Sequence, residues 1–143
     1  MIGEFDSNDM DILDTVTNAW SKGPPMAKRR ATHDCIVTDY NGERGVMVTG
    51  GCSQNCALHL HDTSFFSFAT ETWTELPEMK VGRMGHKMTL LGGMPTVIGG
   101  FDASELSSVE YFDGTQWVLR TDKIPYGIHV FASADEIPDD VTC

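Results

Sequence analysis

Basic residues are scarce in this chain of 143 residues. Only 10 lysines and arginines stand against 21 aspartates and glutamates, so the net charge is −11. Proteins that bind DNA or RNA use clustered lysines and arginines to neutralise phosphates. The one basic cluster is Lys28-Arg29-Arg30, and Arg30 also belongs to a repeated pattern described below. Nucleic acid is therefore not an expected partner, whereas the acidic charge suits solubility and basic or neutral protein partners.

Long apolar runs and a dense set of cysteines are also missing. No apolar run approaches the roughly 18 residues that span a bilayer, so no membrane partner is expected. The first residues, 1–6, lack the basic and apolar regions of a signal peptide. The four cysteines, Cys35, Cys52, Cys56 and Cys143, do not form the framework of a secreted disulfide-rich domain. We therefore expect a reducing, cytoplasmic location, and a Cys52–Cys56 disulfide only if the protein is secreted.

Sequence motifs for catalysis are absent as well. Neither a nucleophile motif nor a phosphate-binding glycine loop is present. One cluster, Cys52, Cys56, His59 and His61, has the thiolates and imidazoles of a tetrahedral zinc site. Its spacing is tighter than in established zinc motifs, so we expect residues 53–61 to form a long loop without metal. No cofactor, metal ligand or catalytic residue is predicted, and the chain is not expected to be an enzyme.

A repeated pattern organises what the sequence does contain. Residues 20–33 and 73–86 both begin with Trp, followed by Met after six residues, Arg after ten and His after thirteen. A degraded third copy starts at Trp117, and the three tryptophans lie 53 and then 44 residues apart. Gly50-Gly51 and Gly99-Gly100 each close a short apolar run. Self-similarity at such a period is the signature of a repeat architecture.

The combined pattern resembles the kelch repeat, in which Arg, a strand ending in Gly-Gly, an aromatic-Asp strand, and a Trp strand with Leu-Pro-x-Met follow one another. Residues 76–79 match the last motif as Leu-Pro-Glu-Met. The resemblance implies blades of a β-propeller at a period of about 50 residues. A closed propeller needs about four to eight blades of four strands. We therefore expect an all-β, partial kelch-type propeller with antiparallel four-stranded blades and an incomplete ring, as a piece of a larger ring or a truncated product.

The repeat divides residues 1–143 into four expected parts. Residues 1–26 supply late strands of one blade, 30–79 and 83–124 are complete blades, and 126–143 begin a further blade with a strand at 129–134. The tryptophans are expected to pack between blades, and the arginines to donate hydrogen bonds to carbonyls at blade junctions. The structural repeat positions are Trp20, Arg30, Gly50, Gly51, Trp73, Arg83, Gly99, Gly100 and Trp117.

The resemblance also implies a function. Kelch propellers present loops at one face of the ring to a protein partner, which for this chain could be a ubiquitin-ligase substrate or actin. A cullin-type ligase role rests on the family alone, since the chain has no BTB or F-box segment. The alternative is a fragment of a propeller enzyme of the galactose-oxidase or sugar-epimerase kind, which gathers metal ligands or acid and base groups from several blades. The partner-binding candidates are Thr32, Gln54, Asn55, Met84, Asp102, Ser104 and Glu105.

Overall fold

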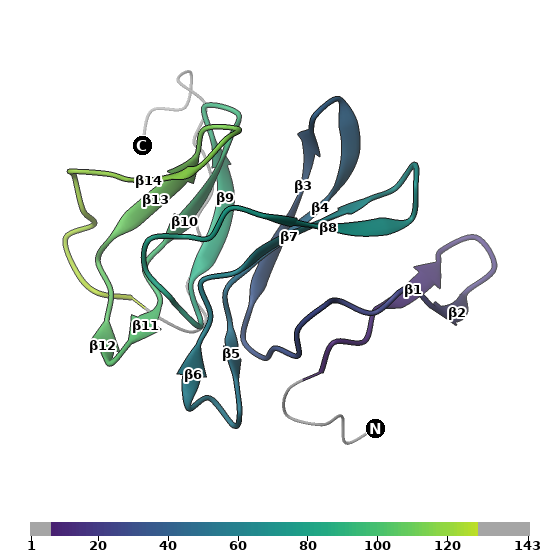
Figure 1. Cartoon of the computed structure of the whole chain (residues 1–143), viewed down its shortest axis with the longest axis horizontal. Helices are drawn as coiled ribbons and strands as arrows, with labels where there is room; N and C mark the ends of the chain where they lie inside the picture. The colour runs from purple at the N-terminus through teal and green to yellow at the C-terminus, as the bar shows by residue number, and fades with distance from the viewer. Residues whose placement is uncertain (1–6, 129–143) are drawn as a thin grey trace.

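The computed structural model describes residues 7–128, and this range consists of strands, turns and loops without any helix. Two four-stranded antiparallel sheets lie side by side, and a separate two-stranded hairpin precedes them (Figure 1). The expected all-β fold with four-stranded antiparallel sheets and an unclosed ring is therefore confirmed. The strand expected at 129–134 lies outside the described residues. Within them, no helix has the length and apolar character needed to cross a membrane.

The first sheet has the strand order β3-β4-β7-β8. It contains β3 (Asp34–Tyr40), β4 (Glu43–Thr49), β7 (Thr63–Ser67) and β8 (Thr72–Leu76). A two-residue turn, Asn41-Gly42, joins β3 to β4, with positive φ angles of 51° and 80°. Asn-Gly is the pair that such tight hairpin turns favour. Because the turn uses only these two residues, the pairing of β3 with β4 extends from Asp34 and Thr49 up to Tyr40 and Glu43.

The second sheet has the order β14-β13-β10-β9. It contains β9 (Lys87–Leu91), β10 (Met94–Ile98), β13 (Val109–Phe112) and β14 (Trp117–Leu119). Gly92 and Gly93 form the β9–β10 turn with φ angles of 57° and 76°. Pro95 is the second residue of β10. The missing N–H of Pro95 is tolerated because pairing with β13 begins only at the next residue, Thr96.

The segments after Gly50-Gly51 and Gly99-Gly100 both contain a short hairpin, whereas a long loop is expected at residues 53–61. The first hairpin consists of β5 (Cys52–Ser53) and β6 (Leu58–His59). The segment after Gly100 contains the corresponding hairpin of β11 (Phe101–Asp102) and β12 (Ser104–Glu105). At Gly51, φ is 93° and an added Cβ would lie 2.5 Å from the carbonyl oxygen of Ala31. Glycine is therefore required where the chain leaves the sheet and passes the neighbouring linker.

The core lies between the two sheets. The first sheet and the linker after it contribute Met47, Phe65, Leu76 and Met79, and the second sheet contributes Met88, Val97, Phe112 and Trp117. The strands β3 and β9 contact each other, so the sheets approach closely at these edges, as neighbouring blades do (Figure 1). Burying one large apolar side chain stabilises a fold by about 1.5–3 kcal/mol. This shared core therefore holds the two blades together.

The three repeat tryptophans have different surroundings. Trp117 is fully buried, and its Nε1 donates a hydrogen bond of 2.8 Å to Thr63 Oγ1 in the preceding sheet. Trp73 is half-buried and donates to the carbonyl of Pro24 at 2.8 Å. Trp20 is 68% exposed, contrary to the expected packing between blades. Trp20 belongs to the isolated hairpin of β1 (Asp11–Asp14) and β2 (Ala19–Lys22), and no other sheet covers its ring within residues 7–128.

The repeat arginines are both buried and both reach the glycine pairs. Nη1 of Arg83 donates to Gly99 O at 2.5 Å, and Nη1 of Arg30 donates to Gly50 O at 2.9 Å. Arg83 also forms a fully buried ion pair with Glu110, at 2.6 Å between Nη2 and Oε1. Each arginine therefore fastens the start of its blade to the end of the second strand.

Candidate interaction face

One side of the molecule gathers the irregular segments of both blades. The hairpins β5–β6 and β11–β12 project together at the bottom of the view in Figure 1. The linkers 23–33 and 77–86 pair with the bases of these hairpins through bridges of Ala31 with Cys52 and of Met84 with Phe101. We call the two hairpins and two linkers together the loop face.

Hydrogen bonds connect the segments of the loop face. Ala31 and Cys52 exchange backbone hydrogen bonds of 2.8 and 2.9 Å, and Met84 and Phe101 exchange bonds of 3.1 and 2.8 Å. The two linkers are joined by the bond from Gly85 N to Thr32 O, at 2.9 Å. The loop face is consequently one continuous layer built from neighbouring blades.

A side-chain contact joins the two hairpins directly. Nδ1 of His59 in β6 lies 2.9 Å from Oδ1 of Asp102 in β11. The His59 ring also packs edge-on against Phe101, with ring centroids 5.8 Å apart. The sequence indicates His59 only as a potential metal ligand and does not indicate this link between the two hairpins. The signal in the sequence that points to this contact is that both loops follow a Gly-Gly pair, which places them at equivalent positions of neighbouring blades.

The structure brings all seven partner-binding candidates to the loop face. Thr32 is exposed in the first linker, and Met84 is partly covered in the second. Gln54 and Asn55 form the exposed tip of β5–β6, with φ angles of 55° and 56°. The second hairpin carries the other three candidates, all exposed: Asp102, Ser104 and Glu105. Whether they contact a partner stays a prediction.

The cysteine and histidine cluster separates into three unrelated contacts. Cys52 and Cys56 form a disulfide, with Cα atoms 4.7 Å apart. His59 contacts Asp102, and Nδ1 of His61 donates to the carbonyl of Met79 at 3.2 Å. Among residues 7–128, no group of three or more His, Cys, Asp or Glu is arranged to hold a metal ion. The sequence leads to this disulfide only for a secreted protein, so its presence differs from what the expected reducing location implies for Cys52 and Cys56.

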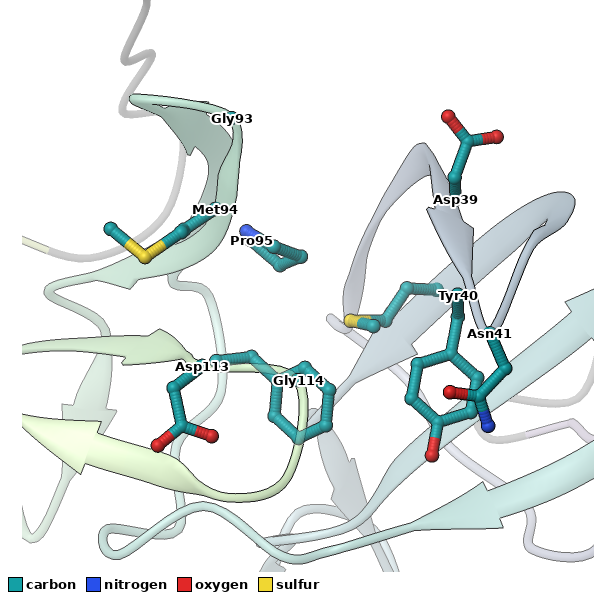
Figure 2. A pocket seen from close by; sticks show the side chains of 10 residues that line it. Asp39, Tyr40, Asn41, Gly93, Met94, Pro95, Asp113 and Gly114 are labelled. Atoms are coloured by element: carbon teal, nitrogen blue, oxygen red, sulfur yellow. The ribbon is translucent and has the colours of Figure 1, made fainter.

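A small cavity lies away from the loop face, beside the β3–β4 and β9–β10 turns. Its volume is about 240 Å³. Figure 2 shows the Asp39 side chain pointing away from Tyr40 and Pro95, so this carboxylate does not point into the cavity. The volume is below the roughly 300–1,000 Å³ of typical small-molecule sites, so the cavity suits one side chain better than a cofactor. Its lining residues are Asp39, Tyr40, Asn41, Met47, Gly93, Met94, Pro95, Phe112, Asp113 and Gly114.

Asp113, at the rim of this cavity, already has partners of its own. Its Oδ1 accepts hydrogen bonds from the Thr115 hydroxyl at 2.7 Å and from the amides of Thr115 and Gln116 at 2.8 Å. These bonds lower the pKa of Asp113, with the Thr115 hydroxyl contributing most. The Asp113 carboxylate therefore stabilises the β13–β14 turn, and the loop face is the stronger candidate for binding.

Comparison with known proteins identifies the repeat. Over 121 residues, covering 77% of the chain, the sequence is 31% identical to human Kelch-like protein 15. The chain belongs to the kelch-repeat family. Rat Kelch-like protein 24 is 28% identical over 116 residues, or 78% of the chain. The kelch chain spans about a fifth of these relatives, 19% of the first and 18% of the second. No family model matches the sequence.

A solved structure shows the same fold. The structure of YjhT covers 86% of the kelch chain with a TM-score of 0.68 and 17% sequence identity. The kelch chain covers 48% of YjhT. The two sheets described above are accordingly blades of a propeller.

Proposed function

We propose that this kelch chain is a non-catalytic interaction module whose loop face binds a protein partner. The observation that carries the proposal is the His59–Asp102 contact, together with the two backbone bridges that fix the loops of neighbouring blades in one layer. Loops held in place before binding lose less conformational entropy on association than mobile loops do. Similarity to the Kelch-like proteins supports the same function.

Two kinds of partner fit this proposal. We infer first the substrate of a cullin-type ubiquitin ligase, and second actin. Support comes from the family, since fold alone does not specify function. The loop residues carry no recognisable partner code. Nothing observed in residues 7–128 favours the alternative of a galactose-oxidase or sugar-epimerase type of enzyme.

Site-specific photo-cross-linking in cells tests which face binds. A benzophenone side chain replaces Ser104 on the loop face or, as the matched control, Thr115 in the β13–β14 turn. We expect protein adducts from position 104 and few from position 115, because both residues are exposed but only Ser104 lies on the loop face. Adducts confined to position 115 would overturn the proposal.

Identification of the adduct separates the two partner classes. A ligase substrate recovered at position 104 should accumulate when the kelch chain is depleted. Actin recovered there should instead co-sediment with the purified kelch chain. If the recovered partner shows neither behaviour, the chain is still an interaction module, but both proposed partner classes are wrong.

A further inference from the structure

The two cysteines of the β5–β6 hairpin form a feature that the binding function does not explain. Cys52 opens β5, and Cys56 lies four residues later at the hairpin tip, disulfide-bonded to it. We propose that Cys52 and Cys56 are a reversible redox couple, closed by low-molecular-weight disulfides such as oxidised glutathione and opened by the corresponding thiol. The couple sets the conformation of the tip that carries Gln54 and Asn55. This inference concerns the hairpin itself and holds whether or not the loop face binds a partner.

The blade does not depend on this disulfide. The base of the hairpin is held by the reciprocal backbone bonds between Cys52 and Ala31, and by the bond of 2.9 Å from Leu60 N to Gly51 O. A disulfide stabilises a fold more when it closes a longer loop, and the separation of four residues here closes only a short one. The bond can therefore open while the sheet stays intact.

The tip has a backbone conformation that opening can release. Gln54, Asn55 and Cys56 are consecutive non-glycine residues with φ angles of 55°, 56° and 61°. The left-handed region is unfavourable for residues with a Cβ, and such residues usually occupy it singly. With the disulfide closed, Cys56 is tied to the fixed base. With it open, the three residues are free to return to more favourable angles.

The two sulfur atoms differ in access, which defines an order of events. Cys52 is fully buried, and its Sγ lies 3.3 Å from Thr32 Oγ1. Cys56 is only partly buried at the tip. Cys56 is therefore the group that meets a dissolved disulfide first, and Cys52 is placed to resolve the product.

The chemistry is two successive thiol–disulfide exchanges. The Cys56 thiolate attacks one sulfur of oxidised glutathione, forming a mixed disulfide and releasing one glutathione thiolate. The Cys52 thiolate then attacks the Cys56 sulfur, forming the Cys52–Cys56 bond and releasing the second glutathione thiolate. The protein loses two electrons, oxidised glutathione gains them, and the two thiol protons pass to the released thiolates. Reduced glutathione reverses both steps.

Alkylation and mass spectrometry of the full folded chain test the couple. The substitutions Cys35→Ser and Cys143→Ser remove the other two cysteines, so that only Cys52 and Cys56 can react. Cys35 in particular is free and exposed. The protein is equilibrated in buffers with a graded ratio of reduced to oxidised glutathione, quenched with acid and alkylated. We expect the bonded fraction to rise with oxidised glutathione and to return to near zero in reduced glutathione. Amide exchange at residues 54–57 should become several-fold faster on reduction, with little change in melting temperature.

Single replacements test the order of the exchanges. Cys52→Ser should accumulate the mixed disulfide at Cys56, whereas Cys56→Ser should leave buried Cys52 unmodified. A pair that stays reduced in oxidised glutathione, that stays bonded in excess reduced glutathione, or that stops at the mixed disulfide would overturn the proposal. If a replacement prevents folding, the titration with both cysteines intact decides the question alone.

Discussion

The tryptophan position of the repeat has a different environment in each copy, at Trp117, Trp73 and Trp20. The exposed fraction of each side chain depends on whether a neighbouring sheet covers its ring, and it ranges from 0% at Trp117 to 68% at Trp20. Trp117 packs on the complete first blade and donates its N–H to Thr63, whereas Trp20 belongs to the two-stranded hairpin β1–β2. The stability contributed by this repeat position therefore depends on the neighbouring blade.

Replacing these tryptophans by alanine should give graded losses of stability. Trp117→Ala should lower the free energy of unfolding by about 3–5 kcal/mol, because it empties a core site and leaves the Thr63 hydroxyl without its donor. Trp20→Ala should change it by no more than about 0.5 kcal/mol, and Trp73→Ala should fall between the two. Urea titrations measure all three changes. Equal losses for Trp117 and Trp20 would show that Trp117 is not the packing residue described.

His86 should make the stability depend on pH. Burial, reinforced by the charge of Arg83, lowers the pKa of His86 to about 3. The unfolded chain has a pKa near 6.5 and thus binds a proton that the folded chain does not. The contribution of the neutral His86 to the free energy of unfolding is therefore fully present above about pH 6.5. It is lost progressively as the pH falls towards 3.

The pH effect of His86 can be isolated by substitution. Between pH 7 and 5, the free energy of unfolding should fall by about 2 kcal/mol through this residue alone. His86→Gln should remove that part of the pH dependence, and His61→Gln, at an exposed histidine, should retain it. Urea titrations at the two pH values give the comparison. An unchanged pH dependence in His86→Gln would contradict the buried, neutral imidazole.

At the scale of elements, the sequence predicted the strands of both sheets but not the hairpins of the loop face. The strands β4 and β10 end directly before Gly50-Gly51 and Gly99-Gly100, as the apolar runs closed by these glycines indicate. The hairpins β5–β6 and β11–β12 have strands of two residues, too short for an alternating pattern to appear. The contact of His59 with Asp102 joins residues 43 apart and depends on the packing of two blades. Sequence spacing alone does not reveal such a contact.

The linker between β8 and β9 depends on one buried carboxylate. Glu110 in β13 accepts hydrogen bonds from the amides of Lys80 and Val81, at 2.7 and 3.1 Å, and also pairs with Arg83. Glu110→Ala should therefore lower the free energy of unfolding by about 3–5 kcal/mol, because a buried charge loses its partner. Glu78→Ala, at an exposed position of the linker, is the control. Similar melting temperatures for the two variants would refute this role of Glu110.

At the scale of the whole molecule, an apolar surface opposes the effect of the acidic charge. Trp20 is 68% exposed, and Leu13 and Ile12 are 40% and 39% exposed on the same hairpin. Exposed apolar groups and sheet edges promote association, whereas a net charge of −11 opposes it. We expect the chain to self-associate as salt screens the charge.

Sedimentation velocity measures this balance. The weight-average sedimentation coefficient should rise with protein concentration at high salt, and Trp20→Ser should reduce the rise. Thr115→Ser, another exposed replacement outside the hairpin, should leave it unchanged. A stable monomer at all salt concentrations would show that the exposed hairpin does not drive association.

The most direct test of the loop face as the binding surface is the dissociation constant for the partner identified by cross-linking. Joint charge reversal, Asp102→Lys with Glu105→Lys, should weaken binding at least tenfold while leaving the melting temperature nearly unchanged. His59→Gln perturbs the same Asp102 contact without reversing a charge and should have a smaller effect, and Asp113→Lys on the β13–β14 turn should have almost none. An unchanged dissociation constant in the double reversal, or a loss of folding instead of binding, would contradict the assignment of the loop face.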